Sequence, residues 1–214
     1  MLDNKSPVFM VLVPVFNRMN LLERAIGSLY RQTFQDFCLV VIDDGSTDNS
    51  LQRAMDLTKK MIHPSGLIRL PENVGVGTAL NIGAEVGRSK SIPWITRLDS
   101  DDVYASDYLE NRLRVIRTYP EVDLFHGGIR VINGPETVPD ARNKKRRIAI
   151  SETSQGATIV VKSEVFKRLG CFDDLRYGED YAFLEKARMA GCSIRKLDFG
   201  DYYYYRDTLN ALTC

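Results

Sequence analysis

Residues 94–102 read WITRLDSDD, a short and mostly apolar stretch that runs directly into three carboxylates. We expect Ile92 to Leu98 to form a buried strand with Asp99, Asp101 and Asp102 at its carboxyl end. Asp99 and Asp101 should then point the same way, because side chains alternate between the two faces of a strand. Two convergent carboxylates suit Mg²⁺ or Mn²⁺, which take oxygen ligands and keep several waters. The alternative is a solvated acidic turn that caps the next helix, and this stretch alone fits both.

The composition is typical of a single soluble domain. The chain has 214 residues, of which 44% are hydrophobic, and this is enough for one well-buried core. Its 29 basic and 28 acidic residues nearly cancel, so the net charge gives no reason to expect nucleic-acid binding. The segment 1–7 lacks the apolar stretch of a signal peptide, and no run approaches the ~18 apolar residues of a membrane span. We expect a cytoplasmic protein with at most peripheral association with the cytoplasmic face of the membrane.

The cysteines give no sign of a structural role. They have neither a CxxC spacing nor neighbouring histidines, so they match neither a zinc site nor a small disulfide framework. We expect reduced thiols, as in a cytosolic protein. The four are Cys38, Cys171, Cys192 and Cys214.

Strands and helices are expected to alternate along the first 125 residues. Apolar runs predict strands at 8–13, 37–42, 67–70, 92–98 and 122–125, and helical spacing predicts helices near 21–30, 50–61, 78–86 and 109–116. Such alternation is typical of a mostly parallel sheet with helices on both faces, where ligands bind beyond the carboxyl ends of the strands. Asp43-Asp44 and Asp99–Asp102 both fall at such ends, which favours the metal and nucleotide site over the capping turn.

Two smaller features of this half concern helix starts. Asn20 with Glu23 resembles a capping box, in which each side chain bonds the backbone of the other residue. Thr47 or Asp48 is placed to cap the helix that begins near Ser50. Both patterns predict where helices begin and neither predicts chemistry.

The second half is less regular. From Asn133 to Ser154, glycine and proline break the pattern, and residues 142–147 hold five basic side chains. We expect a solvated, mobile loop there, and the alternative is a patch for an anionic acceptor or a membrane surface that orders over the site when ligand binds. A helix from about 179 to 190 begins with Glu179 and Asp180, whose acidity the helix dipole alone would explain. A last strand at 193–197 and an aromatic stretch at 202–205 follow.

Six motifs follow one another along the chain: PVFNR at 14–18, DDGSTD at 43–48, ENVGVG at 72–77, DSDD at 99–102, GCFD at 170–173 and GED at 178–180. In this order they resemble the inverting family 2 glycosyltransferases of the GT-A fold. The match runs from about Phe9 to Arg206. The resemblance implies a single GT-A catalytic domain over 1–214, with a Rossmann-like, mostly parallel sheet, a nucleotide-sugar binding half at 1–102 and an acceptor and base half at 103–214.

The family moves a sugar from a nucleotide-diphosphate sugar, here expected to be a UDP-sugar, to an acceptor hydroxyl with inversion. The acceptor is expected to be a glycan or a lipid-linked molecule, in cell-surface polysaccharide or glycoconjugate synthesis. By resemblance, Phe16 packs on the base, Asp44 hydrogen-bonds it, Asp101 holds Mg²⁺ or Mn²⁺, and Asp180 is the general base with Glu179 beside it. The implied nucleotide-binding set is Pro14, Phe16, Asn17, Arg18, Asp44, Asn73, Gly75 and Asp99, and the implied metal set is Asp99, Asp101 and Asp207.

One position departs from the family. Many members carry a histidine after the last Tyr-Arg pair, whereas Asp207 follows Arg206 here. Asp207 could ligate the metal in its place, or Arg206 could contact the diphosphate. Two rival functions remain: a sugar-nucleotide binding module without catalysis, which would need no base, and a dehydrogenase. The dehydrogenase fingerprint would need a third glycine at position 80, where this chain has Leu80.

Overall fold

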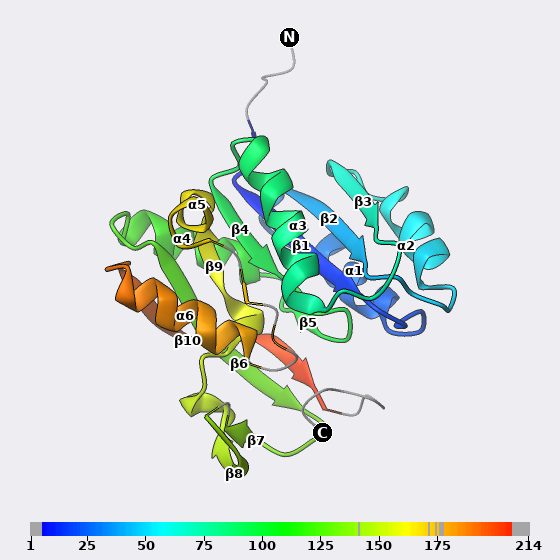
Figure 1. The fold of residues 1–214 in the computed structure, drawn as a ribbon. Helices are drawn as coiled ribbons and strands as arrows, with labels where there is room; N and C mark the ends of the chain where they lie inside the picture. The colour runs from blue at the N-terminus through cyan, green and yellow to red at the C-terminus, as the bar shows by residue number, and fades with distance from the viewer. Residues whose placement is uncertain (1–5, 141, 171, 174, 176–177, 207–214) are drawn as a thin grey trace.

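An eight-stranded sheet forms the centre of the molecule in the computed structural model, which describes residues 6–140, 142–170, 172–173, 175 and 178–206 (Figure 1). Its strand order is β3-β2-β1-β4-β9-β6-β10-β5, with four parallel and three antiparallel pairs in the described part. The predicted mostly parallel sheet is therefore confirmed. The strands are β1 (Phe9–Val15), β2 (Phe37–Asp43), β3 (Ser65–Arg69), β4 (Trp94–Arg97), β5 (Val103–Tyr104), β6 (Leu124–Ile132), β9 (Val160–Lys162) and β10 (Ile194–Tyr205).

Helices cover both faces of this sheet, as expected. Strand β1 is buried along its whole length, and its side chains divide between two cores because they alternate between faces. Phe9 and Val11 belong to the core under α1, α2 and α4, whereas Met10 and Leu12 belong to the core under α3, α5 and α6. The helices are α1 (Leu22–Tyr30), α2 (Ser50–Thr58), α3 (Val76–Ser89), α4 (Tyr108–Thr118), α5 (Ser163–Leu169) and α6 (Glu179–Met189).

The predicted helix caps of the first half are wrong in detail. The Leu21 and Leu22 amides both donate to the carbonyl of Arg18, so the first turn of α1 closes without a capping box from Asn20. Helix α2 follows Asn49, and neither of the predicted residues is its N-cap, although Asp48 Oδ1 accepts from the Ser50 amide at 2.8 Å. In both cases the preceding loop is held by other contacts.

The predicted loop at 133–154 is instead largely ordered as a hairpin of β7 (Thr137–Asp140) and β8 (Asn143–Ala149), which projects from the main sheet (Figure 1). Val138 is paired with Ile148, and these apolar side chains are buried or half-buried, whereas Arg142, Lys145, Arg146 and Arg147 are exposed. The hairpin leads through the short 3₁₀ turns η1 (Ile150–Glu152) and η2 (Gly156–Thr158) into β9. The expectation of an irregular loop is therefore wrong for this segment, and its mobility stays a prediction.

Strand β10 unites two segments that the sequence predicts separately. It pairs in parallel with β6 on both sides of a register shift between Leu197 and Tyr202. Beyond this shift, the aromatic stretch pairs with β5, which follows the acidic turn in the chain. Within the described ranges, no helix has the length and apolar character needed to cross a membrane. The division into a donor half and an acceptor half stays a prediction, although the one sheet takes strands from both.

Candidate active site

A cavity of about 1350 Å³ lies beyond the carboxyl ends of β1, β2 and β4, where the sequence predicts a ligand site. The first turn of α6 and the β7–β8 hairpin complete its wall. Apart from Asp207, which lies outside the described residues, every predicted site residue lines this cavity. These are Pro14, Phe16, Asn17, Arg18, Asp44, Asn73, Gly75, Asp99, Asp101, Glu179 and Asp180.

Asn17 joins the loop after β1 to the loop after β2. It adopts a φ of 53°, which is uncommon for a residue other than glycine. Its side-chain Oδ1 accepts from the Thr47 amide at 2.9 Å, and its own amide donates to Ser46 Oγ at 3.0 Å. The next amide, of Arg18, donates to Ser50 Oγ at 2.8 Å. The structure therefore shows that Asn17 fixes the shape of the cavity wall.

Asp44 orders a third loop of the cavity. Its two carboxylate oxygens accept from the Val74 amide at 2.8 Å and the Gly75 amide at 3.0 Å. Gly45 allows this close approach, because a Cβ there would lie 2.4 Å from the Glu72 carbonyl carbon and its φ is +68°. Its neighbour Asp43 is fully buried, does not line the cavity, and has no partner for either carboxylate oxygen within the described part of the chain.

The acidic residues after β4 lie in a turn, so the expected alternation of strand side chains does not place them. Strand β4 ends at Arg97, and the Asp102 amide donates to the Asp99 carbonyl at 3.0 Å. Asp102 is buried away from the cavity, where its carboxylate accepts from the Tyr202 hydroxyl at 2.8 Å and the Tyr205 amide at 2.9 Å. Only Asp99 and Asp101 remain on the cavity wall.

The charges of this turn are crowded. Burial and the negative charge of Asp99 raise the pKa of Asp101, although Arg18, whose Nε lies 3.7 Å from Asp101 Oδ2, opposes the shift. Burial and the charges of Asp99 and Asp101 likewise hold the pKa of Asp102 well above its usual value. A cation beside Asp99 and Asp101 would relieve this repulsion.

The residues present suit Mg²⁺ or Mn²⁺ bound together with a phosphate ligand. Among the described residues, no group of three or more His, Cys, Asp and Glu side chains is arranged to hold a metal on its own. Mg²⁺ commonly takes only one or two carboxylates and completes its shell with phosphate oxygens and water. Asp101 and Asp99 can supply these two carboxylates, so the donor set fits a metal that arrives with a nucleoside diphosphate.

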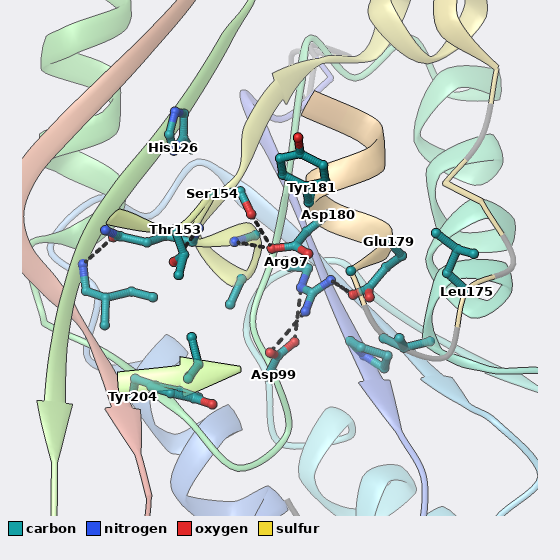
Figure 2. A pocket seen from close by; sticks show the side chains of 18 of the residues that line it. Arg97, Asp99, His126, Thr153, Ser154, Leu175, Glu179, Asp180, Tyr181 and Tyr204 are labelled. Carbon is teal, nitrogen blue, oxygen red and sulfur yellow. Dashed lines mark hydrogen bonds and ion pairs between the residues drawn. The ribbon is translucent and has the colours of Figure 1, made fainter. Parts of the chain in front are cut away.

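The opposite wall of the cavity is the first turn of α6. Gly178 precedes the helix with a φ of 89°, and Asp180 then points toward the segment that links the hairpin to β9 (Figure 2). Asp180 Oδ2 accepts from Ser154 Oγ at 2.8 Å and from the Gly156 amide at 2.9 Å. Two neutral donors thus hold this carboxylate in one orientation.

Arg97 lies between the two acidic walls (Figure 2). Its Nε and Nη2 contact Asp99 Oδ1 and Oδ2, both at 3.1 Å, and its Nη1 contacts Glu179 Oε1 at 3.1 Å. Burial raises the pKa of Glu179, the charge of Arg97 opposes this shift, and the charge of Asp180 adds to it.

Three residues of the cavity wall, Arg97, Ser154 and Gly156, were not predicted from the sequence as part of the site. A buried charge needs a partner of opposite charge or hydrogen bonds, and Arg97 lies at the end of a buried strand. Its sequence position could therefore have predicted an ion pair at the site. Ser154 and Gly156 carried none, because their contact with Asp180 spans 26 and 24 positions of the chain.

The family assignment rests on residues 10–166, which match the model described as Glycosyl transferase family 2. This range is more than half of the chain. The chain belongs to glycosyl transferase family 2. It is 28% identical over 189 residues to the uncharacterized glycosyltransferase RP339 of Rickettsia prowazekii, a match that covers 82% of this chain and 57% of that protein. The chain thus spans little more than half the length of this relative.

Solved structures share the fold and confirm the GT-A architecture. S. aureus TarS in complex with UDP superposes with a TM-score of 0.76 at 25% identity, over 92% of this chain and 60% of that one. The mannosyltransferase PcManGT of Pyrobaculum calidifontis, solved with GDP-Man and Mn²⁺, superposes with a TM-score of 0.74 at 22% identity, over 97% of this chain and 59% of that one. The second likeness shows the fold alone.

Proposed function

We propose that this family 2 chain is an inverting glycosyltransferase that moves a sugar from a nucleotide-diphosphate sugar, a UDP-sugar in the first instance, to an acceptor hydroxyl. The observation that carries the proposal is that one cavity has two unlike acidic walls. Asp99 and Asp101 are crowded carboxylates that a cation would relieve, and Asp180 is a separate carboxylate held by neutral donors. Such a pair of walls suits a donor diphosphate on one side and a reacting hydroxyl on the other.

On the donor side, Phe16 offers an aromatic face to the base, since the residue is 40% exposed at the cavity. Asp44 would contact the base while it keeps residues 74–75 in place, and Asp99 would lie near the ribose. Asp101 and Asp99 would hold Mg²⁺ or Mn²⁺, and when bound the ion supplies positive charge for the departing nucleoside diphosphate. The structure of TarS in complex with UDP supports a uridine nucleotide as part of the donor, and whether Asp207 contributes a metal ligand stays a prediction.

On the acceptor side, Asp180 would act as the general base. Its carboxylate takes the proton of the acceptor hydroxyl as that oxygen bonds to the anomeric carbon, while the bond from this carbon to the diphosphate oxygen breaks on the opposite face. The configuration at the anomeric carbon is thereby inverted. Ser154 and Gly156 would aim the carboxylate, and Glu179 would orient it from the neighbouring position.

The acceptor itself would occupy the part of the cavity beside β6, the hairpin and β10. Ile129, Ile148 and Tyr204 line this part, together with the buried His126. Burial is the largest reason that the pKa of His126 is lowered to about 4, so this side chain is neutral at pH 7. A glycan or lipid-linked acceptor in cell-surface polysaccharide or glycoconjugate synthesis agrees with this mixed apolar and polar wall.

The direct test is a panel of nucleotide sugars, each assayed for transfer or hydrolysis and for protection against thermal unfolding, with and without Mn²⁺. We expect one donor to be turned over and to raise the melting temperature only when Mn²⁺ or Mg²⁺ is present. Metal-dependent protection without any turnover, in wild type and in Asp180→Asn alike, would instead support the non-catalytic binding module. An absence of protection by every nucleotide would contradict both functions.

A further inference from the structure

We propose that Arg97 is a positioning residue that ties the first turn of α6 to the acidic turn after β4 and so keeps Asp180 at a fixed distance from the donor. The inference rests on the proposed function in so far as it takes Asp180 as the base. It goes further in assigning the link between the two walls to one guanidinium group.

The geometry of Arg97 matches this role. Its side chain is only 11% exposed, and it uses two edges of the guanidinium for two different elements. One edge faces Asp99, with a hydrogen bond from Nη2 to Oδ2 and an ion-pair contact of 3.1 Å from Nε to Oδ1, and Nη1 donates to Glu179 Oε1 at 3.1 Å across 82 positions of the chain. A planar guanidinium can hold two carboxylates in a fixed geometry, which an ammonium group cannot do (Figure 2).

The charges of the site require such a link. Asp99, Glu179 and Asp180 all act on Arg97 electrostatically, and Glu179 is itself 10% exposed. Without the guanidinium, like charges would face one another at low exposure, where solvent screens them poorly. Glu179 and Asp180 are adjacent in the first turn of α6, so any displacement of Glu179 would also move the carboxylate of Asp180.

A second buried arginine shows what a purely architectural pair looks like. Arg112 is fully buried, donates to both oxygens of Asp201 at 2.7 and 2.9 Å, and stacks on Tyr108 with 3.9 Å to the ring centroid. All of its partners named here belong to α4 and β10, and the residue does not line the cavity. Arg97 differs in that both of its carboxylate partners line the cavity.

The amide of Gly156 reports the position of Asp180 directly, because it donates to Asp180 Oδ2. The test is to measure amide hydrogen exchange at Gly156 by NMR in the wild type, Arg97→Lys and Arg97→Gln. Arg97→Lys keeps a positive charge beside Asp99 but cannot also contact Glu179. It therefore separates the effect of the link from the effect of the charge better than Arg97→Gln does. The matched control is Arg53→Lys, the same exchange in an ion pair with Glu23 on the far face of the sheet.

We expect exchange at Gly156 to become at least about tenfold faster in Arg97→Lys, and unchanged in Arg53→Lys, with amides of β1 and β2 unaffected in both. With a competent donor and acceptor, kcat should fall by about tenfold or more while the affinity for UDP with Mn²⁺ changes by less than about threefold. Glu179→Gln should reproduce the loss, and the double variant Arg97→Lys/Glu179→Gln should lose little more, because both changes break one contact.

Unchanged exchange at Gly156 in a folded Arg97→Lys protein would overturn the proposal. So would losses in kcat that multiply in the double variant, since Arg97 and Glu179 would then act independently. If Arg97→Gln fails to fold, the decision rests on Arg97→Lys. If the wild type transfers no sugar at all, the proposed function fails, but the exchange ratio at Gly156 still decides whether Arg97 positions Asp180.

Discussion

The acidic turn after β4 and the first turn of α6 present carboxylates to the same cavity in opposite ways. Asp101 lies among like charges, and its pKa is raised by burial and by Asp99. Asp180 is held instead by a hydroxyl and a backbone amide. Crowded carboxylates suit a cation, whereas a single oriented carboxylate suits the acceptance of a proton. The contrast teaches that position in the charge network, more than residue type, separates the two proposed roles.

The largest expected effect comes from Asp180→Asn, which removes the proposed base and keeps the shape of the side chain. General bases typically contribute ~10²–10⁴-fold, so kcat should fall by that factor, equal to about 3–5 kcal/mol of transition-state stabilisation. The matched control is Glu164→Gln, the same kind of change on an exposed residue of α5 outside the cavity. Near-normal turnover in Asp180→Asn would mean that another residue is the base.

Gly156→Ala should also lower turnover, because it displaces the carboxylate of Asp180 without removing it. A Cβ at position 156 would lie 1.9 Å from Asp180 Cβ, which no relaxed structure tolerates, so the carboxylate must move. Misplacement of a catalytic group by about 1 Å can lower the rate by about 10²-fold, and we expect kcat to fall by about this factor. The overpacking should also destabilise the fold by about 1–3 kcal/mol.

The control for that substitution is Gly27→Ala in α1, where the added Cβ would meet its nearest neighbour at an ordinary 3.6 Å. Its turnover should equal that of the wild type, and its melting temperature should rise slightly because alanine favours helix. Comparable kcat values for Gly156→Ala and Gly27→Ala would show that the contact between Gly156 and Asp180 does not matter for transfer.

Asp101→Asn should stabilise the metal-free protein at pH 7 by a few degrees at most. The folded-state pKa of Asp101 is raised above the ordinary value of 3.8, so the folded protein binds this proton more tightly than the unfolded chain. This proton stabilises the fold fully at a pH below the pKa that Asp101 has in the unfolded chain. The stabilisation is lost as the pH rises through the pKa that Asp101 has in the folded protein. The melting temperature of Asp101→Asn should therefore be higher than that of the wild type at pH 7, and the difference should shrink as the pH falls toward 3.8. A variant that is less stable at pH 7 would contradict the crowding of this wall.

The smallest effect is expected at the hairpin, which borders the acceptor part of the cavity. Lys145 and Arg146 are exposed on β8, and trypsin should cut there more slowly once donor and Mn²⁺ are bound, if the hairpin closes over the site. Cutting after Lys59 and Lys60, which are exposed beyond α2, provides the control within the same digest. Equal rates at the hairpin with and without ligand would count against closure.

Many of the strands and helices could be predicted because they follow from local patterns of apolar residues. The apolar runs of β1 and β2 are continuous, as expected for strands buried on both faces, and both are buried at every position. The predicted donor residues gather in one cavity because the carboxyl ends of parallel strands meet at one edge of the sheet. No contact between the loops had to be known for that inference.

The parts that were missed lack such patterns. Strand β5 has two residues, too few to show a period, and in β8 the basic run hides the apolar alternation that reappears only at Ile148. The contacts of Arg97 with Glu179 and of Gly156 with Asp180 join residues that are distant in the chain, and no local signal predicts which distant partner a side chain will meet.

The central claim is that the two acidic walls have separate tasks, and calorimetric titration of UDP tests it most directly. We predict that the wild type and Asp180→Asn bind UDP with similar affinity in the presence of Mn²⁺, and that Asp101→Asn loses the Mn²⁺-dependent part of this binding. A wild type that binds UDP equally well with chelator present, or an Asp180→Asn protein that loses UDP binding together with Asp101→Asn, would contradict the account.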